Sequence, residues 1–280
     1  MSKKYELTND TVTYNGIVLR RIRALRDLEG VRKGELGGYI QRIENLSEEG
    51  NAWVSGSARV SGSACVCGSA RVCGDARVCG DAWVSGNACV GGNALVGDNA
   101  WVSGSARVCG SARVGGNARV GGNAWVSGNA LVGGNALVGD NAWVSGSARV
   151  SGSACVCGSA RVGGNSCVCG NARVCGDARV CGDARVCGDA RVCGDADYMV
   201  FKNSWSSNRW FTCFRVEGGG LMWSVGCFYG TGKELVEKAY KDSQISGDCY
   251  KAAVQMAGKI FAVTTKGDKK NADESMSVLR

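Results

Sequence analysis

Hydrophobic and polar positions recur in a six-residue unit that runs without insertion or deletion over residues 50–193. Each unit reads Gly, then Asn, Ser or Asp, then Ala, a variable residue, Val, and finally Ser, Gly or Cys. Val holds the fifth position of all 24 units, and only Ser166 replaces Ala at the third position. The Gly position fails only at Asp98 and Asp140. A period this regular over half of the chain predicts a repeat architecture.

The period also predicts the shape of each unit. Ala and Val lie two residues apart, so they point to the same face of an extended strand, and the variable residue points the other way. Gly followed by Asn, Ser or Asp favours a turn. Six residues are too few for a hairpin array, so successive units must wind in one direction. Three strands per coil give eight triangular coils of 18 residues, about 38 Å long at a strand spacing of about 4.8 Å.

The units resemble the hexapeptide repeat of left-handed parallel β-helix proteins, which place an aliphatic residue inward and a small residue two positions before it. The resemblance covers residues 50–193 and implies the left-handed winding. We therefore predict an all-β fold for residues 50–196, a left-handed parallel β-helix of about eight triangular coils. A cap is expected at each end of it, because a β-helix leaves open strand edges there.

Residues 1–49 are predicted to form an N-terminal β-hairpin cap, with strands over 11–14 and 17–24 around the turn sequence Asn15-Gly16. The segments Leu36-Gly37-Gly38-Tyr39 and Glu44-Asn45-Leu46-Ser47 follow before the first unit. These two segments resemble the start of phage-encoded and bacterial hexapeptide-repeat proteins described as polymer-forming, whose function is unknown. That resemblance implies a phage or prophage origin.

Residues 197–262 differ in composition and are predicted to form a small C-terminal α+β module. Three strands are expected at 197–202, 210–216 and 221–228. Thr231 and Glu234 form a capping box, which predicts a helix over 232–241, and a second helix is expected over 248–261. The segment from Gly226 to Thr231 resembles a tail motif of the same phage-type proteins. Residues 263–280 are polar and charged, which predicts a disordered tail.

Composition indicates a compartment. The chain has a net charge of +8 and shows neither an apolar run of membrane-spanning length nor a charged-then-apolar signal segment. We therefore expect a cytoplasmic protein without a membrane partner, located in the host cytoplasm if a phage encodes it. Of the 17 Cys, most alternate with Ser and Gly at the last position of the unit. This favours drift in a reducing compartment over a disulfide framework.

The chain contains no His. The acyltransferases whose hexapeptides resemble these units use a His as general base, and they also carry loops that interrupt the repeat. This chain has neither feature, so we predict that it is not an enzyme and that it uses no cofactor. A hexapeptide-type acyltransferase with a carboxylate as its base stays as an alternative.

Cysteine spacing raises a metal site as a second question. Cys157, Cys175 and Cys193 are 18 residues apart and should stack on one corner, and Cys155 lies beside Cys157. Thiolates at such spacing can hold zinc. Replacement of a Ser column by drift explains the same pattern, so we predict no metal and keep these four residues as weak candidates.

The variable positions should form three outward columns, and one of them carries a basic and aromatic stripe. A face of this kind suits a protein partner, because Trp and Arg dominate binding hot spots. It also suits a nucleic-acid strand, through phosphate pairing and base stacking. The stripe consists of Arg107, Trp125, Trp143, Arg161 and Arg179.

The C-terminal module concentrates aromatic residues between Trp205 and Tyr229. Most should form its small core, while Trp205, in a polar loop, is expected to be exposed. We take the C-terminal module as the leading site of partner binding, with Trp205, Trp210 and Tyr229 as its candidate residues. The sequence thus predicts a scaffold that binds a protein partner or associates with itself, with a homotrimer through its flat faces as one form. A nucleic-acid binder is the less favoured alternative.

Overall fold

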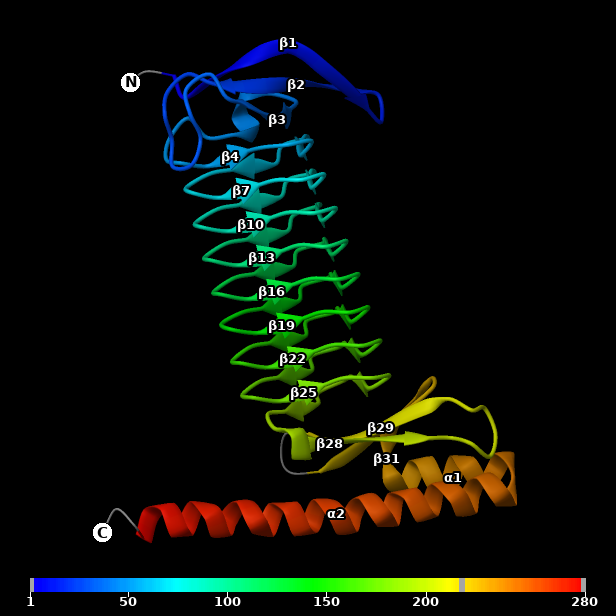
Figure 1. Ribbon diagram of the computed structural model, residues 1–280. Helices are drawn as coiled ribbons and strands as arrows, with labels where there is room; N and C mark the ends of the chain where they lie inside the picture. Colours follow the sequence, from blue (N-terminus) through cyan, green and yellow to red (C-terminus); the bar gives the residue numbers. More distant parts are fainter. Residues whose placement is uncertain (1–2, 217–219, 278–280) are drawn as a thin grey trace.

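The computed structural model describes residues 3–216 and 220–277, and a long parallel β-helix forms its middle, with a β cap at the N-terminal end and a mixed module at the other (Figure 1). Every hexapeptide unit supplies one two-residue strand made of its variable residue and its Val. Strands 18 residues apart pair in parallel, as Trp125 does with Trp143. The predicted β-helical fold is therefore confirmed, with three strands in each coil.

The three faces of the prism are named here by their strands. Face 1 contains β4 (Trp53–Val54), β7 (Arg71–Val72), β10 (Cys89–Val90), β13 (Arg107–Val108), β16 (Trp125–Val126), β19 (Trp143–Val144), β22 (Arg161–Val162) and β25 (Arg179–Val180). Face 2 contains β6 (Cys65–Val66), β9 (Trp83–Val84), β12 (Trp101–Val102), β15 (Arg119–Val120), β18 (Leu137–Val138), β21 (Cys155–Val156), β24 (Arg173–Val174) and β27 (Arg191–Val192). Face 3 contains β5 (Arg59–Val60), β8 (Arg77–Val78), β11 (Leu95–Val96), β14 (Arg113–Val114), β17 (Leu131–Val132), β20 (Arg149–Val150), β23 (Cys167–Val168) and β26 (Arg185–Val186).

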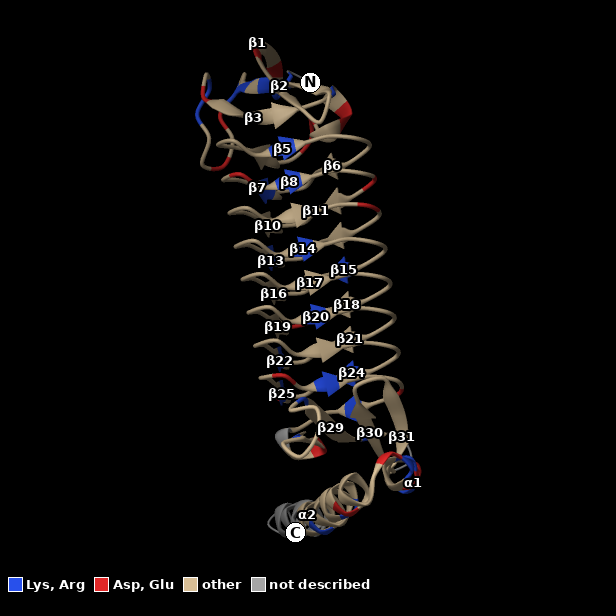
Figure 2. Cartoon of the chain, turned by 90° about the vertical axis from the view of Figure 1, so that its right-hand side faces the viewer, with Lys and Arg blue, Asp and Glu red and all other residues tan. Residues whose placement is uncertain are grey.

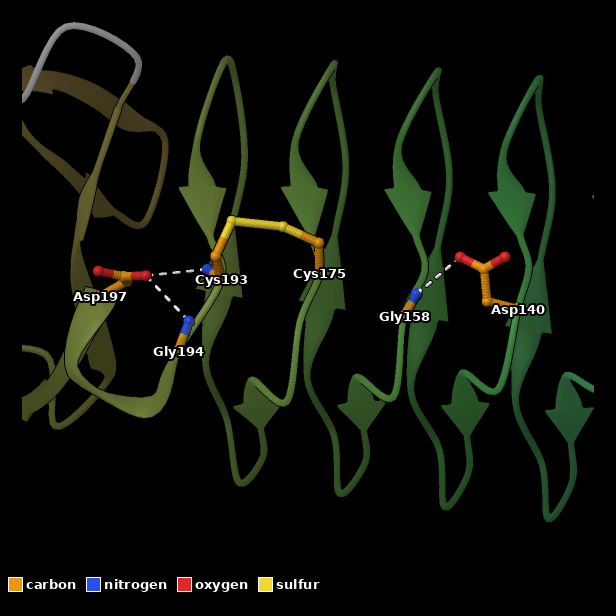
Figure 3. The surroundings of a disulfide bond; sticks show 6 residues. All are labelled: Asp140, Gly158, Cys175, Cys193, Gly194 and Asp197. Carbon is orange, nitrogen blue, oxygen red and sulfur yellow. Dashed lines mark hydrogen bonds between the residues drawn. A yellow bond between two sulfur atoms is a disulfide. The ribbon is translucent and has the colours of Figure 1, made fainter. Parts of the chain in front are cut away.

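The interior of the prism consists of the Val and Ala columns, whose side chains are almost completely buried. Corners turn at the Gly position, where Gly128 for example has φ +67°, a conformation that side chains disfavour. Asp140 adopts the same conformation, and its Oδ2 accepts a hydrogen bond from the Gly158 N–H in the next coil (3.0 Å; Figure 3). Asp98 does likewise with Gly116 (2.7 Å). The two exceptions to Gly thus gain a contact between coils.

At the N-terminal end, β1 (Tyr5–Tyr14) and β2 (Ile17–Ala24) form the expected antiparallel hairpin. Asn15 and Gly16 both have positive φ, as the hairpin turn requires. The strand β3 (Leu36–Ile40) pairs antiparallel with β2 and parallel with β5. After η1 (Ile43–Asn45), Leu46 bridges Val66 in parallel. The β-helix therefore begins with an incomplete coil before the first hexapeptide.

At the C-terminal end, η2 (Asp195–Asp197) leads into a separate antiparallel sheet in the order β28-β29-β30-β31. Its strands are β28 (Tyr198–Lys202), β29 (Trp210–Arg215), β30 (Leu221–Val225) and β31 (Phe228–Thr231). The sequence predicted only three strands, because it did not separate the short β31 from β30. Gly226, with φ +59°, provides the turn between them.

Two helices complete the module, α1 (Gly232–Asp242) and α2 (Gln244–Ser277). The capping box forms as expected, with Thr231 N–H donating to Glu234 Oε2 (2.8 Å) and Glu234 N–H to Thr231 Oγ1 (3.3 Å). The helix α2 extends into the segment 263–280, where the sequence predicted a disordered tail. No proline interrupts this segment, and lengthening an existing helix costs less than starting one. Residues 278–280 lie outside the described part. No described helix has the length and apolar character needed to cross a membrane.

Candidate partner-binding surfaces

The predicted stripe on face 1 exists as a stack of side chains. The indoles of Trp125 and Trp143 are parallel within 3°, with ring centroids 5.0 Å apart. The guanidinium of Arg107 lies 5.5 Å from the centroid of Trp125, and that of Arg161 lies 5.9 Å from the centroid of Trp143. Arg161 and Arg179 lie at paired positions of the neighbouring strands β22 and β25. The structure therefore brings all five predicted residues together in one column.

The stack is partly held by the prism and partly open. Trp125 is half-buried and its indole N–H donates to Cys109 Sγ (3.0 Å), whereas Trp143 is 39% exposed. Each cation–aromatic contact contributes about 0.5–1 kcal/mol at an exposed site. On the C-terminal side of Trp143, a cleft of about 350 Å³ is lined by Trp143 itself and by Arg161, Arg179 and Cys181. The stripe thus offers a rigid aromatic and cationic surface next to a shallow cleft.

A second tryptophan pair, on face 2, was not among the predicted site residues. Trp83 and Trp101 are 43% and 50% exposed, with ring centroids 6.1 Å apart and planes tilted by 41°. Arg119 lies 5.6 Å from the Trp101 centroid. The signal for this pair was available in the sequence, because the two residues are 18 apart. They are more exposed than the face 1 pair but less ordered in their stacking.

Trp205 does not occupy the exposed position that the sequence suggested. Its ring packs edge-on against Phe211 (6.0 Å) and Tyr250 (5.1 Å) in the core between the sheet and α2. The neighbouring Asn203 is buried and its Nδ2 donates to the Tyr250 hydroxyl (2.8 Å). The expectation of an exposed Trp205 was wrong, because the polar loop folds back onto a helix that is distant in sequence. Its role in partner binding stays a prediction.

Trp210 and Tyr229 are 43% and 40% exposed, respectively. Trp210 is the first residue of the inner strand β29, and Lys202 Nζ lies 5.7 Å from its ring centroid. Tyr229 instead faces the β-helix, where its hydroxyl accepts a hydrogen bond from Asp189 N–H (3.4 Å). Trp210 is therefore the better placed of the two for an external contact.

The C-terminal module closes the end of the prism. Phe214 is fully buried against the Val and Ala core, and Thr212 Oγ1 accepts a hydrogen bond from Arg185 N–H (2.9 Å). Asp197 Oδ2 accepts from the N–H groups of Cys193 and Gly194 (both 2.9 Å; Figure 3). These contacts satisfy backbone donors that a further coil would otherwise pair. The module thus has a structural role at the last coil.

The four weak metal candidates do not assemble into one site. Cys175 and Cys193 form a disulfide (Figure 3), while Cys155 and Cys157 are free thiols. Burial is the main cause that raises the pKa of Cys155, to about 11, which disfavours the thiolate that zinc needs. Across residues 3–216 and 220–277, no three His, Cys, Asp or Glu side chains gather closely enough to hold a metal ion.

The repeat of the β-helix is also similar to one of a known protein family. A family model described as the YdcK beta solenoid repeat matches residues 70–86 and 112–128, both within the hexapeptide array. No curated protein matches the chain. The chain thus carries β-solenoid repeats similar to those of that family. The phage-type resemblance of the two ends stays a prediction.

Proposed function

We propose that this protein is a non-catalytic β-solenoid scaffold that binds a protein partner, or a second copy of itself, through the stripe on face 1. The observation that carries the proposal is the parallel Trp125–Trp143 stack with an arginine on each outer side. Trp and Arg are the residues most enriched at binding hot spots. Because the stack is already ordered, a partner would lose little side-chain entropy on binding it. The proposed setting is the cytoplasm, of a host cell if the origin is phage.

The stack also bears on the nucleic-acid alternative. Sequence-tolerant binding of single strands depends on bases stacking on open aromatic faces. Trp125 lies between Arg107 and Trp143, and Trp143 lies between Trp125 and Arg161. Both faces of each indole are therefore occupied, and a base would have to displace an arginine. This arrangement favours a protein partner over a nucleic acid.

The acyltransferase alternative is the weaker one. The family mechanism uses a His as general base, and this chain contains no His, so a carboxylate would have to replace it. Every unit from residue 50 to residue 193 is also uninterrupted, so no inserted loop borders a substrate cleft. A scaffold role needs neither feature.

The proposal is tested with the double variant Trp125→Ala/Trp143→Ala and the matched control Trp83→Ala/Trp101→Ala on face 2. Sedimentation of the reduced proteins over a range of concentrations measures self-association, and affinity capture with identification of proteins and nucleic acids measures external partners. We expect the face 1 variant to lose association by about tenfold or more, since hot-spot residues contribute about 2 kcal/mol or more each. The face 2 variant should keep it. Equal losses in both variants, or capture of nucleic acid alone, would contradict the proposal.

A further inference from the structure

Face 3 carries a strict alternation of cationic and apolar residues that the stripe on face 1 lacks. From β8 to β26, each arginine strand is followed by a strand with a Leu or Cys at the same position, and Figure 2 shows blue strands alternating with tan ones along β8, β11, β14, β17 and β20. The alternating residues are Arg77, Leu95, Arg113, Leu131, Arg149, Cys167 and Arg185.

A groove follows the same residues. It has a volume of about 600 Å³ and is lined by Leu95, Arg113, Leu131 and Arg149. Its floor is open because the last position of three successive units on this edge is Gly, at 97, 115 and 133. A second hollow shares Arg149 and Cys167 with it and continues to Arg185. We call these two adjoining hollows the face 3 groove.

The arginines in the middle of the face 3 groove are free to pair with a ligand. Within the described residues, the side chains of Arg113 and Arg149 are exposed and make no hydrogen bond, ion pair or aromatic contact. The arginines of face 1 differ, since Arg107 and Arg161 lie on tryptophans. The one carboxylate that lines the groove, Asp98, already accepts a hydrogen bond from Gly116 N–H (2.7 Å). The groove therefore presents arginine side chains without ion-pair partners between Leu95 and Leu131, with Asp98 and the Cys167 thiol as acidic groups among its lining residues.

We propose that the face 3 groove binds an acidic amphipathic α-helix of a partner protein. Coils of a parallel β-helix repeat about every 4.8 Å, so successive arginines lie about 9.6 Å apart with an apolar residue midway. On an α-helix, residues seven apart are separated by about 10.5 Å, and a residue three or four positions on lies midway between them. Acidic residues at i and i+7 with a Leu at i+3 or i+4 would thus face arginine, leucine and arginine in register, as helix-in-groove recognition requires.

Other occupants match the groove less well. A second copy docked through the same face would place arginine against arginine or would leave it unpaired against Leu. An extended peptide repeats its side chains on one face about every 6.6–6.8 Å, which does not match the coil spacing. A single-stranded nucleic acid would find no aromatic side chain among the residues that line the groove.

The inference goes beyond the proposed function, because it concerns a different face from the stripe. Its test therefore leaves Trp125 and Trp143 unchanged. Loss of the face 1 interaction and loss of the face 3 interaction can be told apart, since each has variants that do not touch the other.

The probe is a fluorescent synthetic helix of about 20 residues, long enough to span the groove. Its heptads carry Glu at one position and Leu three positions later. A scrambled peptide of the same composition and a labelled oligothymidine are the comparison ligands. The first variant, Gly133→Leu, places an apolar side chain in the lining of the groove and alters no charge. The site has room for it, because a Cβ at Gly133 would meet nothing within 4 Å. The matched control is Gly139→Leu, the same position of the unit on the next edge, which is equally open.

A second pair of variants tests the charges. Arg113→Glu/Arg149→Glu reverses the charge of two side chains that line the groove. Arg119→Glu/Arg173→Glu makes the same change in net charge on face 2. Fluorescence anisotropy should show binding of the patterned helix that weakens about tenfold or more in Gly133→Leu and in the groove charge variant. Both controls should stay within about twofold of the parent. Circular dichroism verifies that each variant is folded.

The proposal is overturned if the parent protein does not bind the patterned helix, or if the scrambled peptide binds as tightly. It is also overturned if the controls weaken binding as much as the groove variants do. Tighter binding of oligothymidine that is lost in both charge variants would assign the arginines to nonspecific polyanion binding instead.

Discussion

At the residue scale, Ser166 is the one departure from Ala at the inward third position. Its side chain is fully buried, and its hydroxyl has no hydrogen-bond partner among the described residues. A buried polar group without a partner costs about 1–3 kcal/mol. The regular column thus contains one identifiable weak point.

We therefore predict that Ser166→Ala stabilises the protein by about 1–3 kcal/mol, because it removes an unsatisfied hydroxyl and adds no atoms. Ala148→Ser, which introduces the same hydroxyl one coil earlier in the same column, should destabilise it by a similar amount. Urea unfolding followed by circular dichroism measures both. A loss of stability in Ser166→Ala would show that the hydroxyl finds a partner.

Thiols at equivalent variable positions should differ in reactivity. A hydrogen bond from Cys169 is the main cause that lowers the pKa of Cys167, to about 6, whereas burial raises that of Cys155 to about 11. A group is deprotonated above its pKa, so at pH 7 Cys167 is mostly thiolate and Cys155 is mostly thiol. Because the thiolate is the nucleophile, we expect alkylation of Cys167 to be faster by about tenfold or more.

Iodoacetamide labelling of the reduced protein between pH 5 and pH 9, read out by peptide mass spectrometry, tests this difference. The rate at Cys167 should be half-maximal near its pKa of about 6. Equal rates at the two sites, or a Cys167 rate that rises only above about pH 8, the range of an ordinary thiol, would contradict it.

At the element scale, the corner between two strands depends on glycine in a left-handed conformation. Gly128 has φ +67°, and a Cβ there would lie 2.8 Å from the carbonyl oxygen of Gly146. Both the conformation and the close approach of the next coil therefore disfavour a side chain. Asp98 and Asp140 accept the conformation, and each carboxylate compensates with a hydrogen bond to the next coil.

We predict that Gly128→Ala costs at least about 1–2 kcal/mol, the penalty of the left-handed conformation alone. Gly133→Ala is the matched control at the last position of the same hexapeptide. Gly133 does not have a left-handed conformation, and a Cβ there would meet nothing within 4 Å. The control should change stability by no more than about 0.5 kcal/mol. The free energy of unfolding in urea measures the pair, and equal effects would show that corner geometry is not limiting.

At the scale of the whole molecule, both ends of the prism are closed by chain that does not belong to the repeat. The N-terminal hairpin continues face 3 through β3, and the C-terminal sheet buries Phe214 against the last coil. Open strand edges would otherwise pair with other molecules. Phe214 thus serves to close the prism, while Phe211, Trp223 and Tyr250 form the module's own core.

Removal of residues 195–280 should therefore convert the protein into an end-to-end associating species. The deletion exposes the last strand edges and the Val and Ala column, which together attract a second end. Size-exclusion chromatography with light scattering, under reducing conditions, should give a larger mass for the truncated chain than for the full chain. A truncated chain with unchanged mass would show that the module is not needed to close the prism.

The sequence by itself determined the β-helix, because a period of six with Ala and Val two apart leaves one way to bury every inward side chain. The same period placed Trp125 above Trp143, since residues 18 apart must stack. The hairpin turn at Asn15-Gly16 and the cap at Thr231 followed from local backbone preferences alone.

Only the tertiary structure decided what depends on residues distant in sequence. Trp205 packs against Tyr250 of α2, and Tyr229 contacts Asp189 of the last coil. Trp143 lies between Trp125 and Arg161, and the rotamers that bring these side chains together do not follow from the period. The face 3 groove was visible as a column of residue types but not as a hollow. The hollow follows glycines 97, 115 and 133, which lie in three successive coils. The period determines the strand and the face on which a residue lies, whereas packing against residues distant in sequence determines the conformation and burial of its side chain.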